Sequence, residues 1–148
     1  MSRPTSPRPQ IDPRGPRFGA WVTSAVLAVV LLVSGDATVA GSLLALQALV
    51  FALGSQGRSP YVLLWKRFLR RGVPAELEDA APPRFAQLVG LTFAAVGVLG
   101  FFAGLPLLAQ VATALALVAA LLNAAIGLCL GCELYLIYTR TITKGATA

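Results

Sequence analysis

Apolar residues gather in four long runs along the chain, and polar residues, glycines and prolines gather between them. The first run covers about Phe18–Val33 and the second about Ala37–Leu53, with Ser34-Gly35-Asp36 between them. Each run is slightly shorter than the ~20 residues that a membrane-spanning helix uses. Two short apolar runs joined by so brief a turn predict a helical hairpin.

A second pair of runs follows in the other half of the chain. The third run covers about Phe85–Ala103, and Gly104-Leu105-Pro106 then turns the chain into a fourth run, Leu107–Tyr138. At a rise of ~1.5 Å per residue, one straight helix over the fourth run would exceed the ~30 Å hydrocarbon core of a bilayer. This helix must tilt strongly, protrude or break, and the glycines make Gly127–Gly131 the candidate break.

A shorter segment between the second and third runs has a different pattern. One helical face of Tyr61–Arg71 carries apolar and aromatic residues, and the opposite face carries basic residues. A basic amphipathic helix of this length lies in the membrane interface rather than crossing the bilayer. We therefore predict an interfacial helix over residues 60–71, whose membrane-interface residues are Tyr61, Trp65, Lys66, Arg67, Arg70 and Arg71. Docking of an acidic partner on its basic face is the alternative.

These elements predict an all-α membrane protein with four transmembrane helices in two hairpins, plus one interfacial amphipathic helix between spans two and three. Residues 1–17, rich in Pro, Ser and Arg, predict a disordered basic cytoplasmic tail. Residues 18–140 would form the membrane domain, with a polar loop at 72–84. Residues 141–148 would form a short cytoplasmic tail.

Composition and charge support this assignment and give it a direction. The chain is 57% hydrophobic and 12% charged, whereas soluble domains carry about a quarter charged residues. With four spans, all twelve basic residues fall on one side, and the two opposite turns carry only Asp36. The positive-inside rule then predicts a multi-pass protein of the cytoplasmic (inner) membrane with both termini cytoplasmic. The net charge of +6 is therefore assigned to topology and lipid headgroups, and no nucleic-acid partner is expected.

Small and polar residues within the runs predict how the helices associate. Close approach of helices in lipid uses small residues at four-residue spacing, here Ala86, Gly90 and Ala94 in span three and Ala112, Ala116, Ala120 and Ala124 in span four. These stripes predict a tight contact between spans three and four, or a homodimer seam. Polar side chains in lipid need partners, so four of them should point inward: Gln47, Thr92, Gln110 and Asn123.

The candidate chemistry lies in one segment, N-A-A-I-G-L-C-L-G-C-E-L-Y, which holds both cysteines of the chain, Cys129 and Cys132. Cys-x-x-Cys spacing is the arrangement of redox pairs. In an unbroken helix, Cβ atoms three residues apart lie ~5–6 Å from each other, whereas a disulfide needs ~3.5–4.5 Å. Redox cycling therefore requires a distorted helix, or a new helix starting at the pair. Gly127 and Gly131 would permit either one.

Other features bear on this site. A helix N terminus near Cys132 favours a thiolate, whereas burial in lipid and the adjacent Glu133 disfavour one. Glu133 is either a proton carrier for thiol exchange or an ion-pair partner of Arg140 or of the interfacial helix. Asn123 is either an interhelical hydrogen-bonding residue or a supporting residue of the site. Tyr135 and Tyr138 are expected to be interfacial anchors. The chain has no histidine, which excludes His-based acid–base catalysis, His-ligated haem and Cys/His zinc sites.

Four motifs carry a resemblance to a known family: IDPRGPRFGAW at 11–21, SPY at 59–61, PPRFAQ at 82–87 and the cysteine segment at 123–135. With them, nearly the whole chain resembles a bacterial integral membrane family catalogued as the domain of unknown function number 4395. The resemblance implies genes neighbouring thioredoxin-like proteins and sulfurtransferases, and it carries no assigned activity.

Three functions follow from these observations. The first is a thiol–disulfide or sulfur-relay protein, using Cys129 and Cys132 at the cytoplasmic end of the last helix, with a thioredoxin-like protein or sulfurtransferase as partner and no cofactor. The second is a non-catalytic scaffold or a dimeric thiolate metal site, since two thiolates are too few for a structural zinc ion. An unbroken last helix would favour this second function. The third is a transporter of a small sulfur compound, with Glu133 as the only intramembrane charge that would mark a path.

Overall fold

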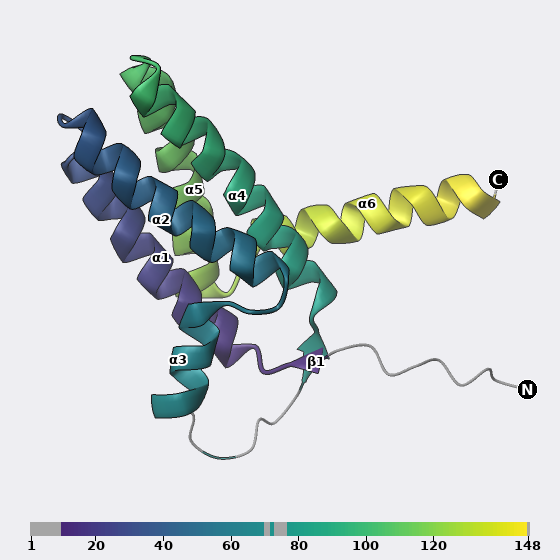
Figure 1. Cartoon of the computed structure of the whole chain (residues 1–148). Coiled ribbons are helices and arrows are strands. Elements are labelled where there is room, and N and C mark those ends of the chain that lie inside the picture. Colours follow the sequence, from purple (N-terminus) through teal and green to yellow (C-terminus); the bar gives the residue numbers. More distant parts are fainter. Residues whose placement is uncertain (1–9, 70–71, 73–76, 148) are drawn as a thin grey trace, which may run out of the picture.

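The computed structural model describes residues 10–69, 72 and 77–147. Its main body is a bundle of four antiparallel helices (Figure 1), each long and apolar enough to cross a membrane. The bounds of these helices are α1 Arg14–Leu32, α2 Ala37–Ser55, α4 Ala81–Phe102 and α5 Pro106–Ile126. The predicted all-α membrane fold with four spans in two hairpins is confirmed.

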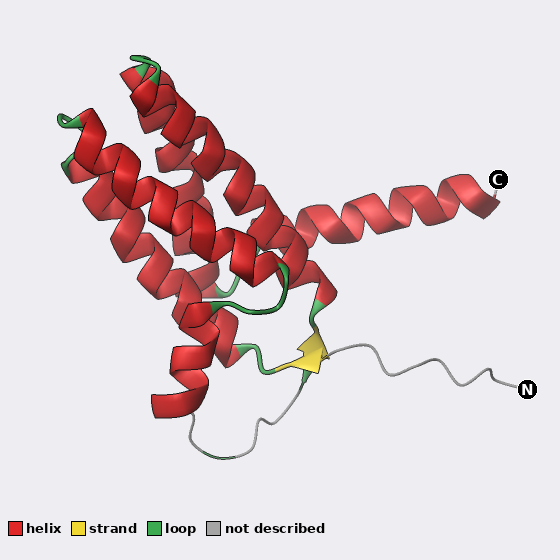
Figure 2. Cartoon of the chain, in the orientation of Figure 1, coloured by secondary structure: helices red, strands yellow, loops and turns green. Residues whose placement is uncertain are grey.

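The four helices enclose a core of apolar side chains. Leu27 and Val30 of α1 and Leu44 of α2 are fully buried, and Phe51 of α2 and Phe101 of α4 are nearly so. Helix α2 packs mainly against α4, α1 against α5, and α4 against α5. The two tight turns between α1 and α2 and between α4 and α5 lie at one end of the bundle, and all the other elements lie at the opposite end (Figures 1 and 2).

The predicted close contact between spans three and four is confirmed, and glycines outside the predicted stripes add to it. A Cβ atom added to Gly100 would lie 3.0 Å from the backbone nitrogen of Ala109, and one added to Gly97 would lie 3.7 Å from the Ala109 carbonyl. Glycines on α4 thus let α5 approach closely. Within the predicted stripe, Ala94 is buried, whereas Gly90 faces Phe51 of α2.

Polar side chains inside the bundle are paired. Gln47 is buried and donates from Nε2 to Thr23 Oγ1 at 3.3 Å, and Gln110 donates to Ser34 Oγ at 3.1 Å. Thr92 was predicted to point inward, and this prediction is wrong. Its side chain is exposed, and its hydroxyl donates to the Leu88 carbonyl one turn earlier, at 3.0 Å. A threonine satisfies its hydroxyl within its own helix and needs no neighbour.

The predicted helix between spans two and three is α3, Pro60–Phe68. Two of its aromatic side chains, expected at the lipid interface, instead contact the bundle. Trp65 is only 7% exposed and lies 3.3 Å from a Cβ position built on Gly15 of α1, with the Arg14 guanidinium 5.5 Å from its ring centre. Tyr61 donates its hydroxyl to Gln47 Oε1 at 2.8 Å. A protein surface and a lipid surface both accept an apolar face, and here α1 covers part of it.

The chain before α1 is structured from Gln10 onward. Gln10–Ile11 (β1) pairs antiparallel with Glu78–Asp79 (β2), and α1 begins at Arg14, four residues before the expected start of span one (Figure 2). Asp12 is buried and accepts hydrogen bonds from the backbone and guanidinium of Arg14. The rest of the predicted tail, residues 1–9, lies outside the described residues.

The fourth apolar run does not form one helix. Helix α5 ends at Ile126, and α6, Leu130–Thr147, leaves the bundle sideways at the same end as α3 (Figure 1). Helix α6 is not among the four helices apolar enough to span a membrane. Residues 141–147 of the predicted C-terminal tail are helical, because α6 continues to Thr147.

Candidate functional site

The break between α5 and α6 lies where the glycines predicted it. Gly127 has a φ of 74°, in the left-handed region that glycine adopts without steric cost. Its backbone N–H donates to the Asn123 carbonyl at 3.1 Å, and the N–H of Leu128 donates to the Leu122 carbonyl at 3.2 Å. The carbonyls at the end of α5 are thereby satisfied, and the chain is free to change direction.

The cysteine pair forms the first turn of the new helix. Cys129 precedes the first residue of α6, and its carbonyl accepts the first helical hydrogen bond, from the Glu133 N–H at 3.0 Å. The Cys129 sulfur accepts a second hydrogen bond, from the backbone N–H of Cys132 at 3.2 Å. Cys129 and Cys132 form a disulfide with a Cα–Cα distance of 5.1 Å. The sequence predicted the pair at the end of the last transmembrane helix; it lies just beyond that helix, at the start of α6.

This arrangement is suited to thiol chemistry. A helix N terminus presents unpaired N–H groups and a partial positive charge, which stabilise a thiolate formed there. Cys129 occupies this N-cap position, so its sulfur would carry the negative charge after reduction of the disulfide. Both cysteines are half-buried.

Gly131, between the two cysteines, holds this turn against α4. A Cβ atom added to Gly131 would lie 2.6 Å from both the Cα and the Cβ atoms of Ala86. Farther along α6, the rings of Tyr135 and Tyr138 lie 5.6 and 6.4 Å from the ring of Phe85. The two tyrosines, expected as interfacial anchors, therefore attach α6 to α4. Phe85 and Ala86 belong to the PPRFAQ motif, but nothing in the sequence showed that they meet the cysteine turn.

An arginine that the sequence reasoning missed supports the end of α5. Arg17, in the first turn of α1, donates from Nη2 to the Ala124 carbonyl at 3.3 Å. This contact satisfies a carbonyl of the last turn of α5 and places a positive charge at the negative end of its dipole. Arg17 had been interpreted only as a topology signal, because a sequence does not show which helix end an arginine reaches.

The expected ion pair between Glu133 and Arg140 is absent from the described part of the chain, and so is one between Glu133 and Lys66 or Arg67. Glu133 and Arg140 lie seven residues apart on one helix, about 10 Å along its axis, too far for an ion pair. The Glu133 side chain is exposed and lies next to Cys132. Asn123 is half-buried, and its side chain forms no hydrogen bond with any described residue. Its backbone carbonyl accepts the Gly127 N–H at the end of α5.

The predicted site residues thus fall into two groups. Gly127, Cys129, Gly131, Cys132 and Glu133 lie together at the α5–α6 junction, whereas the predicted interface residues lie on and after α3. On α3, Lys66 and Arg67 are exposed, and burial raises the pKa of the Tyr61 hydroxyl above its usual value, so that it stays a hydrogen-bond donor. Arg70 and Arg71 lie outside the described residues.

A family model for a domain of unknown function (DUF4395) matches residues 11–140. The chain belongs to the DUF4395 family. The match runs from β1 to the middle of α6 and includes the α5–α6 junction with both cysteines. No curated protein and no solved structure matches the chain. DUF4395 as a family supplies no activity, so the function of this member has to be inferred from its own geometry.

Proposed function

We propose that this DUF4395 protein carries out thiol–disulfide exchange at the membrane surface through Cys129 and Cys132. The observation that supports this proposal most strongly is the position of Cys129. It caps a new helix, and its sulfur accepts the backbone N–H of Cys132. A purely structural pair of small residues has no need of a helix break, an N-cap sulfur and a close contact at the intervening glycine.

The exchange would take place in two balanced steps. In the reduced protein, the Cys129 thiolate attacks a partner's disulfide, forms a mixed disulfide and releases one partner sulfur as a thiolate. The Cys132 thiolate then attacks the Cys129 sulfur, which closes the Cys129–Cys132 disulfide and releases the second partner sulfur. The partner is thereby reduced by two electrons, and the Cys129–Cys132 pair is oxidised by two electrons. The reverse sequence consumes a partner dithiol. Glu133 is exposed and follows Cys132 in the sequence, and its carboxylate is the proposed proton acceptor for the exchange.

The distribution of charge supports a cytoplasmic location for this site. The two tight turns, which contain Asp36 as their only charged residue, lie at the end of the bundle opposite α3 and α6. The basic residues therefore belong to the end that carries the disulfide, and the positive-inside rule favours the cytoplasmic side of the inner membrane for it. Disulfides in a reducing cytoplasm are usually transient and catalytic, and a thioredoxin-like protein is the partner class that fits.

The broken helix also favours this function over the alternatives. A thiolate metal site or a scaffold role would be favoured by a helix continuous through Gly127, and α5 ends there. A transporter would need an intramembrane charge, and Glu133 lies outside the four candidate spans. A sulfur relay uses the same Cys129 thiolate, so it remains the second chemical outcome at this site.

The test uses reduced full-length protein with single cysteine replacements. The probe is a thioredoxin in which the second cysteine is Ser and the first is activated as a mixed disulfide with thionitrobenzoate. We expect Cys132→Ser, which keeps Cys129, to release thionitrobenzoate and form a stable adduct. Cys129→Ser should react about tenfold more slowly, since it lacks the N-cap sulfur. The double Ser variant is the control.

Equal rates for the two single variants, or no adduct with either one, would overturn the proposal. Incubation with a persulfide-carrying sulfurtransferase separates the two chemistries. Mass gain of one sulfur atom on Cys129, without a mixed disulfide in the first assay, would identify a sulfur relay.

A further inference from the structure

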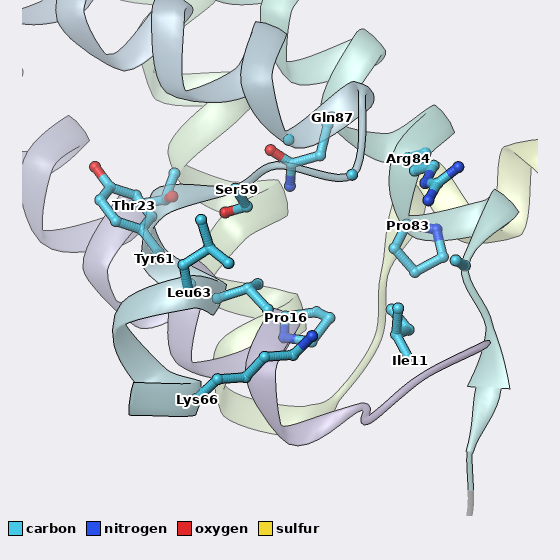
Figure 3. A pocket seen from close by; sticks show the side chains of 15 residues that line it. Ile11, Pro16, Thr23, Ser59, Tyr61, Leu63, Lys66, Pro83, Arg84 and Gln87 are labelled. Carbon is cyan, nitrogen blue, oxygen red and sulfur yellow. The ribbon is translucent and has the colours of Figure 1, made fainter. Parts of the chain in front are cut away.

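A second feature of the molecule lies apart from the cysteines. A cavity of about 100 Å³ opens between α1, the α2–α3 connection, α3 and the start of α4 (Figure 3). Ile11, Pro16 and Pro83 form apolar parts of its wall. Its polar lining comes from six residues on α1, the α2–α3 connection, α3 and α4: Thr23, Ser59, Tyr61, Lys66, Arg84 and Gln87.

The charge of this lining is one-sided. Lys66 and Arg84 line the cavity, and none of its lining residues is acidic. Neither side chain has an ion-pair or hydrogen-bond partner within the described residues, and the same holds for the side chains of Ser59 and Gln87. Tyr61 and Thr23 differ, because both are hydrogen-bonded to Gln47. Four donor groups without a partner among the described residues, two of them cationic, thus share one cavity.

Two glycines make room for two of these groups. Gly57 has a φ of 78°, and a Cβ atom added to it would lie 2.6 Å from Nη2 of Arg84. A Cβ atom added to Gly54 would lie 2.5 Å from Oε1 of Gln87. The end of α2 therefore lacks side chains where the guanidinium and the amide lie. Figure 3 shows Arg84 and Gln87 extending from α4, Ser59 on the connection before α3, and Lys66 on α3.

We propose that this cavity binds a phosphate group, as carried by the headgroup of an anionic phospholipid. Guanidinium and ammonium groups together are the usual protein ligands of phosphate. Basic pockets between transmembrane helices at a membrane surface bind anionic headgroups. The cavity lies at the end of the bundle where α3 and α6 leave it, and its volume suits a headgroup phosphate rather than a whole lipid. This inference does not depend on the chemistry of the cysteines.

The test compares neighbouring basic residues that differ only in whether they line the cavity. Purified full-length protein is placed in phosphatidylcholine nanodiscs, and binding of fluorescent phosphatidylglycerol is titrated. Lys66→Gln and Arg84→Gln should each weaken binding about tenfold, equivalent to the loss of one charge-assisted contact. Arg67→Gln, next to Lys66 but with its guanidinium beside Phe68, and Arg58→Gln should change binding less than twofold.

Inorganic phosphate supplies the second arm of the test. Competition by millimolar phosphate, with the same two variants affected, would support the site and assign it to a free anion. Selective phosphatidylglycerol binding without such competition assigns it to the lipid headgroup. Equal weakening by Lys66→Gln and Arg67→Gln would overturn the proposal, because binding would then come from general surface charge. Lys66 is exposed, so its replacement should leave the fold intact; thermal unfolding of both Gln variants checks this.

Discussion

Helices α3 and α6 leave the same end of the bundle, and they are attached to it in opposite ways. Helix α3 inserts large side chains: Trp65 is buried on α1, and Tyr61 reaches Gln47 between α1 and α2. Helix α6 has no buried side chain among its described residues. It is attached by a glycine pressed on Ala86 and by two tyrosines beside Phe85.

The two attachments therefore differ in strength: the contact of α3 anchors a helix to the bundle, whereas the contact of α6 mainly positions the cysteine turn. Burying a tryptophan gives α3 a large share of apolar contact, so α3 is expected to stay on α1 whenever the bundle is folded. The contact of α6 depends on the absence of a side chain, and most of the helix remains exposed. Such an attachment positions the cysteine turn while burying little apolar surface. It can therefore be broken without unfolding the bundle. Truncating a buried side chain should therefore weaken the packing of α3 on the bundle. Enlarging Gly131 should weaken the packing of α6 on α4.

The largest effect is expected for Trp65→Ala. Loss of this buried side chain should lower the free energy of unfolding by about 3 kcal/mol, since a cavity is left against Gly15 of α1. Phe68→Ala, on the same helix but 70% exposed, should change it by less than about 0.5 kcal/mol. Detergent-induced unfolding measures both variants. Equal effects would mean that α3 is not anchored by its buried face.

Gly131→Ala is expected to come next. Its added methyl group would meet the backbone of Ala86 at 2.6 Å, and relief of this clash should cost about 1–3 kcal/mol of α6 docking. Gly145→Ala, on the same helix in open space, is the control. Hydrogen exchange of the first turns of α6 measures the docking. Unchanged protection in Gly131→Ala would contradict the close contact between α6 and α4.

A smaller effect is expected for Tyr61→Phe. The ring is kept, but the hydroxyl no longer donates to Gln47, whose buried Oε1 loses its partner. An unsatisfied buried acceptor costs about 1–2 kcal/mol. Thermal unfolding of this variant, compared with Tyr138→Phe on α6, whose ring is 57% exposed, checks the prediction. A larger loss of stability in Tyr138→Phe than in Tyr61→Phe would contradict the stronger anchoring of α3.

The smallest effect is expected for Tyr135→Leu. It removes a ring 5.6 Å from Phe85 while keeping an apolar side chain, and such aromatic pairs contribute about 0.5–1.5 kcal/mol. Exchange in the first turns of α6 should accelerate by up to about tenfold, with α3 unaffected. Acceleration in both helices would show that they are coupled.

The sequence could predict elements whose cause is local. Long apolar runs predicted the four spans, because hydrocarbon tolerates only a closed hydrogen-bonded backbone. The glycines predicted the break before Cys129, because only glycine adopts the conformation of Gly127 easily.

Contacts between distant elements could not be predicted in the same way. The apolar face of α3 was recognised, but lipid and α1 satisfy an apolar face equally well, so the burial of Trp65 did not follow. The bond from Arg17 to Ala124 joins residues 107 positions apart, and no local pattern encodes it. Arg84 and Lys66 looked like topology signals, and only the fold brings them to one cavity.

The cysteine bridge closes a ring of only four residues along the chain. A cross-link restricts the unfolded chain in proportion to the logarithm of the loop that it closes, which for so short a loop amounts to about 2 kcal/mol, against nearly 5 for a hundred-residue loop. Reducing the disulfide therefore changes the conformational entropy of the unfolded chain very little outside residues 129–132. We therefore expect reduction of this bridge to leave the fold of the four-helix bundle unchanged.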